Sequence, residues 1–160
     1  MNAAGGDRTE RAGMAPLKKR LGKDGLSDRR RDVILLQPGE GRHYRLGLLS
    51  GVFKADEAET EAAYSVSEWI LEPGLNGIGE HSHVANDEVF YVLEGVPEIL
   101  IGNCWRYCTP GTFLRIPAGT LHDFRNTGEA TARLLNLFIP GGFERNMPRI
   151  CAWFSDQEKL

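Results

Sequence analysis

The residues that decide the fold run from Gly74 to Gly95 and read GLNGIGEHSHVANDEVFYVLEG. His81 and His83 stand one residue apart, and this spacing puts both imidazoles on one face of an extended segment. Glu88 has the opposite parity, so the strand register must break within residues 84–87 before its carboxylate can point the same way. Two imidazoles and one carboxylate on one face suit a divalent transition metal.

A second stretch, from Gly111 to Asn126, reads GTFLRIPAGTLHDFRN and supplies a further candidate ligand, His122. Pro117 fixes the turn ahead of this histidine. Asn126 is expected to anchor the backbone after its strand through side-chain hydrogen bonds. The chain has four histidines, and three of them lie in these two stretches, with only His43 outside. On spacing alone, a surface or core role for these histidines stays the alternative to metal binding.

Short apolar stretches separated by Gly, Pro and Asn turns continue to both sides of these residues, from residue 33 onward. Strands are expected at residues 44–53, 64–71, 88–93, 98–101, 104–107, 113–116, 121–125 and 131–139. The dipeptide Gly102-Asn103 suits a tight hairpin turn, and residues 55–62 indicate a loop or one helical turn. A helical signal follows residue 142, although Pro148 interrupts it. Many short strands without β-α-β alternation predict an all-β sandwich or barrel.

The composition of the 160-residue chain fits one globular domain, with 41% hydrophobic and 26% charged residues. No apolar run approaches the roughly 20 residues that span a bilayer. The charged N-terminus has no apolar segment behind it, so no secretory signal is expected. The three cysteines are an odd number without a CxxC pair, which favours reduced thiols. We therefore expect a cytoplasmic protein without a membrane partner.

Charge divides the chain unevenly. Residues 1–32 hold nine Lys/Arg and five Asp/Glu, a net charge of +4, which leaves −7 for residues 33–160 because the whole chain carries −3. Their polarity predicts a flexible basic leader, followed by a barrel over residues 33–145 and a C-terminal tail over residues 146–160. The basic clusters of the leader lack interleaved aromatic residues, so no nucleic-acid partner is expected.

Together the two quoted stretches resemble the two motifs of the cupin superfamily, G-x5-H-x-H-x3,4-E-x6-G and G-x5-P-x-G-x2-H-x3-N. The only departure is the first glycine, because Leu75 stands where the pattern has Gly and Gly74 precedes it. The resemblance implies a single cupin barrel, a double-stranded β-helix or jelly roll. It also implies one divalent transition metal (Fe, Mn, Ni, Co, Cu or Zn), whose ligands are His81, His83, Glu88 and His122.

A wider stretch, FRNTGEATARLLNLFIPGGFE over Phe124–Glu144, resembles single-barrel cupins of the quercetin 2,3-dioxygenase-like group. This resemblance implies a metal-dependent dioxygenase that acts on a flavonol-like or other enol or phenol substrate. Glu88 is then expected to be catalytic, as both ligand and general base. Strand parity gives three apolar candidate pocket residues, Phe90, Val92 and Phe124, for which plain barrel core is the alternative. Arg115 is a fourth candidate: it is the one basic residue in a motif strand and would favour an anionic substrate if it points inward, but its parity with Phe113 leaves either direction open.

Two other functions fit the same ligand set. One is a non-catalytic cupin that binds a metal or small ligand, and the other is a cupin isomerase, lyase or decarboxylase that uses the same metal site. In each case the partner is a small molecule. A homodimer is also expected, because exposed sheet edges are commonly covered by a second chain. The candidate covering elements are Val33–Leu36 and Trp153-Phe154.

Overall fold

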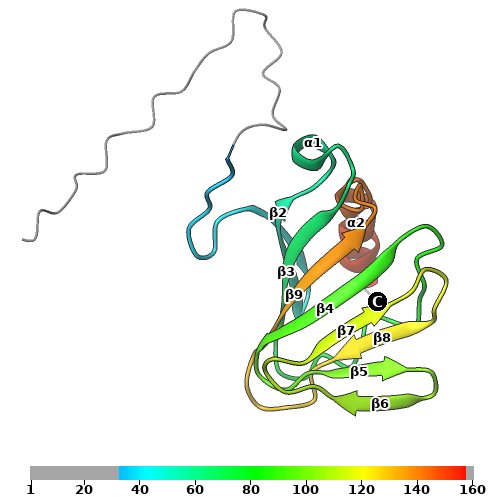
Figure 1. Ribbon diagram of the computed structural model, residues 1–160. Coiled ribbons are helices and arrows are strands. Elements are labelled where there is room, and N and C mark those ends of the chain that lie inside the picture. The colour runs from blue at the N-terminus through cyan, green and yellow to red at the C-terminus, as the bar shows by residue number, and fades with distance from the viewer. Residues whose placement is uncertain (1–32, 158–160) are drawn as a thin grey trace, which may run out of the picture.

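Two antiparallel sheets form the framework of the computed structural model, which describes residues 33–157 (Figure 1). The larger sheet has the strand order β1-β2-β3-β9-β4-β7, and the smaller has the order β6-β5-β8. The strands are β1 (Arg42–Leu46), β2 (Leu49–Ala55), β3 (Ser65–Leu71), β4 (Asp87–Glu94), β5 (Glu98–Ile101), β6 (Cys104–Tyr107), β7 (Phe113–Ile116), β8 (His122–Arg125) and β9 (Ala132–Ile139). This arrangement confirms the predicted all-β jelly-roll fold.

Alternating burial along three neighbouring strands builds the interior. In β3 and β9 every second residue is buried, and β4 buries Glu88, Phe90 and Val92 in the same way. The smaller sheet adds Ile99 and Phe124 to this core, and Phe124 lies 5.7 Å from Phe90 between ring centroids. Apolar area removed from water therefore joins the two sheets.

Within residues 44–53 the structure corrects the prediction of one strand. The segment divides into β1 and β2, which pair as an antiparallel hairpin with Leu46 opposite Leu49. The turn uses Gly47, whose φ of 62° falls in the left-handed region that glycine enters without steric cost. A lone glycine among leucines is a weak turn signal in the sequence, so the hairpin was missed.

Three short helical segments complete the described chain: α1 (Glu57–Thr60), the 3-10 turn η2 (Glu144–Asn146) and α2 (Met147–Gln157). The prediction that Pro148 interrupts the last helix is wrong. Pro148 lies in the first turn of α2, where the missing N–H has no intrahelical acceptor to lose. Met147 is fully buried, and Ile150 and Phe154 pack against the core, so α2 covers the barrel beside β1.

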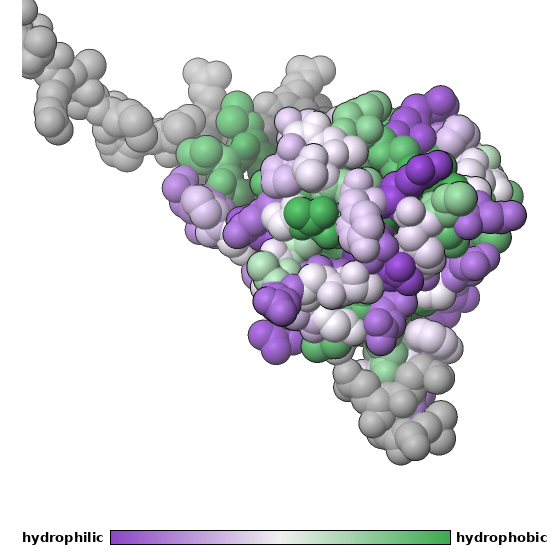
Figure 2. All heavy atoms as spheres, turned by 90° about the horizontal axis from the view of Figure 1, so that it is seen from below, coloured by the Kyte–Doolittle hydropathy of each residue, from purple (hydrophilic) through white to green (hydrophobic). Residues whose placement is uncertain are grey.

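Hydrophobic surface gathers where the described chain begins (Figure 2). Residues Val33–Leu36 form no regular element, and their side chains are exposed, Val33 at 90% and Leu35 at 72%. The expected homodimer, for which this segment is a candidate covering element, stays a prediction. The predicted leader, residues 1–32, lies outside the described residues. No described helix has the length and apolarity needed to cross a membrane.

Asn126 closes the turn that follows β8, as the sequence predicts. Its side chain is buried, and its amide nitrogen donates hydrogen bonds to the carbonyl oxygens of Leu71 and Ala130, both at 2.9 Å. Its amide oxygen accepts a hydrogen bond from the Gly128 N–H. One side chain therefore ties the end of β3 to the turn between β8 and β9.

Asn126→Ala should lower the free energy of unfolding by about 2–3 kcal/mol, because it removes the donor to the buried Leu71 carbonyl together with the contacts to the Ala130 carbonyl and the Gly128 N–H. Urea denaturation of the purified protein measures the change. Asn76→Ala is the matched control, since Asn76 is exposed, and it should change stability by less than about 0.5 kcal/mol. Equal stability of the two variants would contradict the anchoring role.

Candidate metal centre

One backbone bridge and one further backbone hydrogen bond bring the histidine-bearing segments together. His81 and His122 exchange both backbone hydrogen bonds, each at 2.9 Å, in an isolated antiparallel bridge. The Gly119 N–H then donates to the His83 carbonyl oxygen at 2.9 Å. These contacts align the irregular segment before β4 with the start of β8, so side chains about 40 residues apart in the sequence share one location.

Four potential ligands converge at this location. One side-chain atom from each of His81, His83, Glu88 and His122 lies within 4.8 Å of all the others, a grouping that could hold a metal ion. Glu88 Oε2 lies 2.7 Å from His122 Nε2 and 3.3 Å from His83 Nε2. Glu88 and His122 are buried, whereas His81 and His83 are partly exposed. The cluster is therefore open on the side of the two neighbouring histidines.

Backbone carbonyls fix the orientation of two of the imidazoles. Nδ1 of His81 lies 2.8 Å from the Gly79 carbonyl oxygen, and Nδ1 of His122 lies 2.8 Å from the Thr120 carbonyl oxygen. A carbonyl only accepts, so each Nδ1 must carry the proton that it donates. In the neutral imidazole this leaves the Nε2 lone pair directed into the cluster, as in metal-binding histidines.

The atoms facing one another in the cluster fit a cation. Within residues 33–157, His83 Nε2, Glu88 Oε2 and His122 Nε2 are buried and have no hydrogen-bond partner of acceptable geometry, despite their short separations. Buried polar atoms without partners are costly in a folded protein. Imidazole nitrogens with a carboxylate oxygen suit the first-row divalent metals. One ion of this kind would satisfy all three atoms at once.

Charge within the cluster follows from burial and proximity. Burial raises the pKa of Glu88, but His122 and His83 beside it outweigh burial and hold this pKa below the ordinary value of a glutamate. Burial lowers the pKa of His122, yet Glu88 and the Thr120 carbonyl raise it above the ordinary value. Burial also lowers the pKa of His81. Glu88 is thus ionised and His81 neutral, the forms that bind a metal.

A polar side chain from β9 supports Glu88, and the sequence analysis missed it. The Asn136 amide nitrogen donates to Glu88 Oε1 at 2.6 Å, and its amide oxygen accepts a hydrogen bond from the Ser67 hydroxyl at 3.2 Å. Both residues are fully buried. The available signal was a single polar residue at an inward position of the apolar strand Ala132–Ile139. Because Asn136 donates to Oε1 of Glu88, Oε2 is the carboxylate oxygen that faces the other candidate ligands.

Aromatic rings enclose the His83 imidazole. The ring of Phe138 lies 5.0 Å from it at an interplanar angle of 86°, and the ring of Phe143 lies 5.2 Å away at 88°. The two phenylalanines stack on each other at 3.9 Å. Neither was named as a candidate from the sequence, because core packing already accounts for an inward Phe138 in β9 and Phe143 lies outside any strand. They form an apolar wall on one side of the cluster.

The predicted pocket residues lie in two different environments. Phe90, Val92 and Phe124 are buried in the core cluster between the sheets. Arg115 is exposed, and its guanidinium donates hydrogen bonds to the Asp87 carboxylate at 2.5 and 2.9 Å. The three apolar side chains thus fill the barrel interior, whereas Arg115 is engaged at the surface.

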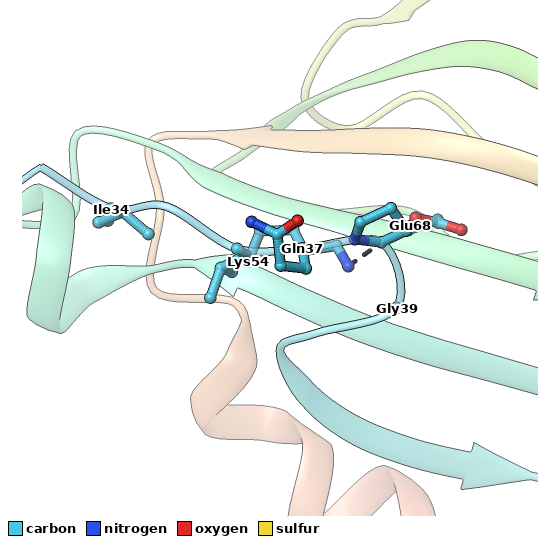
Figure 3. Close-up of a pocket in the computed structure, with 7 residues that line it drawn as sticks. Ile34, Gln37, Gly39, Lys54 and Glu68 are labelled. Atoms are coloured by element: carbon cyan, nitrogen blue, oxygen red, sulfur yellow. Dashed lines mark ion pairs between the residues drawn. The ribbon is translucent and has the colours of Figure 1, made fainter. Parts of the chain in front are cut away.

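A hollow lies away from the cluster, between the entering chain and the outer face of the sheet. Its volume is about 450 Å³, and it is lined by Ile34, Leu36, Gln37, Pro38, Gly39, Lys54 and Glu68 (Figure 3). Lys54 and Glu68 form an ion pair at 3.8 Å. No residue of the four-ligand cluster contributes to this hollow. The convergence of polar groups, and not this hollow, therefore identifies the candidate site.

Comparison with known proteins locates the same residues within a shared domain. Residues 67–138 match the family described as the cupin domain. Quercetin 2,3-dioxygenase of Bacillus subtilis (strain 168) is 30% identical over 112 residues, which make up 69% of this chain and 32% of that protein. Protein SchB of Streptomyces halstedii is 36% identical over 66 residues, 41% of this chain and 47% of SchB. The matches thus span about a third to a half of these relatives.

Solved structures share the fold at low sequence identity. The polyketide cyclase RemF from Streptomyces resistomycificus has a TM-score of 0.61 at 17% identity, covering 68% of this chain and 80% of RemF. An RmlC-like cupin from Shewanella frigidimarina NCIMB 400 has a TM-score of 0.60 at 14% identity, covering 72% of this chain and 98% of that one. At such identities the likeness concerns the fold alone.

His122→Ala should weaken the binding of Co(II) or Zn(II) by more than the roughly 10–100-fold typical of losing an outer partner, because it removes one nitrogen of the cluster. Isothermal titration calorimetry of the metal-free protein measures the dissociation constant. His43→Ala is the matched control, since His43 is exposed on β1. The cluster is not the metal site if both variants bind as tightly as the wild type.

Asn136→Leu should lower metal affinity by roughly 10–100-fold while keeping all four candidate ligands, because Glu88 Oε1 loses its donor. The same titration measures the effect. Ser67→Ala serves for comparison: it removes only the contact to the far side of Asn136, so its effect should be smaller. Wild-type affinity in Asn136→Leu would show that Glu88 needs no orienting partner.

Proposed function

We propose that this chain, whose residues 67–138 match the cupin domain, is a metal-dependent dioxygenase acting on a flavonol-like or other enol or phenol small molecule. The observation that carries the proposal is the convergence of His81, His83, Glu88 and His122, three of which, all but His81, place a buried atom without a hydrogen-bond partner in the cluster. The identity of the metal is left open, because this ligand set accepts most first-row divalent ions.

The likeness to quercetin 2,3-dioxygenase supports the reaction class. It is a 30% identity that extends over 69% of this chain but only 32% of that protein, so the activity comes to this chain as a proposal. All four candidate ligands fall inside residues 67–138, the part that matches the cupin domain.

The surroundings of the cluster favour an apolar, planar substrate. Phe138 and Phe143 present an aromatic wall beside His83. On the backbone segments that flank the ligands, Val84 is 90% exposed and Leu121 is 50% exposed. No lysine or arginine among residues 33–157 is buried. An aromatic ring therefore finds apolar contacts here.

Each polar residue then has a role in binding or proton handling. A bound divalent ion would act as a Lewis acid and make a substrate hydroxyl more acidic. Glu88 Oε2 is the atom placed to accept the hydroxyl proton, because Oε1 is occupied by the Asn136 donor. His81 and His122 hold fixed orientations through their backbone acceptors. The buried position of Glu88 keeps competing water away from the proton.

Two other functions remain as alternatives: a non-catalytic cupin that binds a metal or small ligand, and a cupin isomerase, lyase or decarboxylase. Oxygen consumption separates all of them from the dioxygenase. A binding protein converts no substrate, and the non-oxidative enzymes convert substrate without consuming oxygen.

Protein reconstituted without oxygen, separately with Fe, Mn, Co and Ni, should consume oxygen when quercetin or a simpler phenol is added. One oxygen molecule should disappear for each substrate molecule, as a Clark-type electrode and chromatography can measure. Glu88→Gln should lower the rate by on the order of 100-fold or more, because it removes the proton acceptor. His43→Ala should react as the wild type does. No uptake with any of the four metals would overturn the dioxygenase proposal.

A further inference from the structure

Asp56 is a buried carboxylate that the proposed chemistry does not use. It lies between β2 and α1, and only 3% of it is exposed. Its carboxylate accepts a hydrogen bond from the hydroxyl of Ser65, the first residue of β3. A carboxylate buried in this way must be satisfied by donors, and the remaining donors come from a distant part of the chain.

Two backbone N–H groups, on either side of Phe143, supply these donors. The Gly142 N–H donates to Asp56 Oδ1, and the Glu144 N–H donates to Asp56 Oδ2 at 2.7 Å. Charge-assisted hydrogen bonds of this kind are roughly twice as strong as neutral ones. The two carboxylate oxygens of Asp56 thus accept hydrogen bonds from the backbone on both sides of Phe143.

Close approach of the two segments depends on glycine. A Cβ on Gly141 would lie 2.6 Å from the backbone carbon and oxygen of Tyr64, closer than a real Cβ can approach. Gly142 has a φ of 90°, a conformation that side chains disfavour. The Gly141 N–H also donates to the Ala62 carbonyl oxygen at 2.8 Å. Residues 140–144 are therefore pressed against the α1–β3 connection at a defined position.

The ring held between these hydrogen bonds contacts a candidate ligand. Phe143 packs with an interplanar angle of 88° against the His83 imidazole, 5.2 Å away, and stacks on Phe138. No hydrogen bond between His83 and a backbone carbonyl like those of His81 and His122 is present among the described residues. Ring packing by Phe143 and Phe138, together with the approach of Glu88 Oε2 to Nε2 at 3.3 Å, thus limits rotation of this imidazole.

We propose that Asp56 is a positioning residue for the candidate metal centre: it fixes Phe143 through the flanking amides, and Phe143 fixes the His83 imidazole. The inference rests on the proposed metal site for its function, but the mechanical link from Asp56 to His83 concerns the protein alone. Small displacements of a ligand matter, because productive sites require their groups to be held within about 0.5 Å.

Asp56→Asn tests the link, because the amide has a single acceptor oxygen and places an NH2 donor against one of the two backbone N–H groups. In the metal-free protein, the carbon-bound imidazole proton resonances of His83 should move in Asp56→Asn and in Phe143→Leu, as the ring current of Phe143 changes. The resonances of His43 should stay in place. Unchanged His83 resonances in a folded variant would overturn the proposal, whether or not the protein binds a metal.

Co(II) titration supplies the second readout. Asp56→Asn and Phe143→Leu should each raise the Co(II) dissociation constant by about 10-fold, and the double variant should be no worse than Phe143→Leu, because both act through one ring. Effects that multiply would overturn the proposed route through Phe143. If Asp56→Asn does not fold, Phe143→Leu carries the test, and a wild-type His83 signal in that variant would overturn the proposal.

Glu98→Gln is the matched control for a general loss of stability. Glu98 is also a carboxylate that is 3% exposed, and it accepts hydrogen bonds from Arg125 and Thr127 in the smaller sheet. It should lower thermal stability without moving the His83 resonances or the Co(II) affinity. A shift of the His83 resonances in Glu98→Gln equal to that in Asp56→Asn would mean that destabilisation alone moves the imidazole, and this would overturn the proposal.

A wild-type protein that binds no Co(II) would count against the proposed metal site. The link from Asp56 to His83 would then be decided by the resonance test alone.

Discussion

The structure depends on placing an ionised carboxylate, Glu88, inside an apolar barrel. Removing such a charge from water costs several kcal/mol even after relaxation, unless donors and opposite charges surround it. Here one oxygen is satisfied by Asn136, and the other faces the imidazoles of His83 and His122. These groups come from β9, from the segment before β4 and from β8, so satisfying one side chain requires both sheets to be in place.

The register of the strands places these partners around Glu88. Glu88 lies opposite Phe138 in the β4–β9 pair, and Asn136 lies opposite Phe90 in the same pair and opposite Ser67 in the β3–β9 pair. Because side chains alternate between faces, a slip of one residue would expose all of these polar groups together with the core. The alternation that buries the phenylalanines therefore also aims the polar side chains. The same strand pairing thus forms the core and assembles the candidate site.

The sequence allowed the fold class and the convergence of four polar residues to be predicted, because strand alternation and the two motifs are local patterns. It failed where geometry is set by contacts between distant segments. Gly47 ends a strand inside residues 44–53, although one glycine is a weak turn signal. Asn136, Phe143 and Asp56 gained their places only through tertiary pairing, and nothing near them in the sequence shows which group they meet. A parity argument that had included β9 would have found Asn136.

The polar band across β3, β9 and β4 argues for a function over a purely structural role. Buried ionic groups can often be replaced by apolar residues of similar volume with no loss, or with a gain, of stability. Ser67, Asn136 and Glu88 occupy inward positions, and most other inward positions of the same strands hold apolar residues such as Trp69, Leu134 and Phe90. If stability alone had shaped this interior, the band would be apolar. Its hydrogen bonds instead hold one carboxylate oxygen in a fixed direction, which is what a site that binds a cation and moves a proton requires.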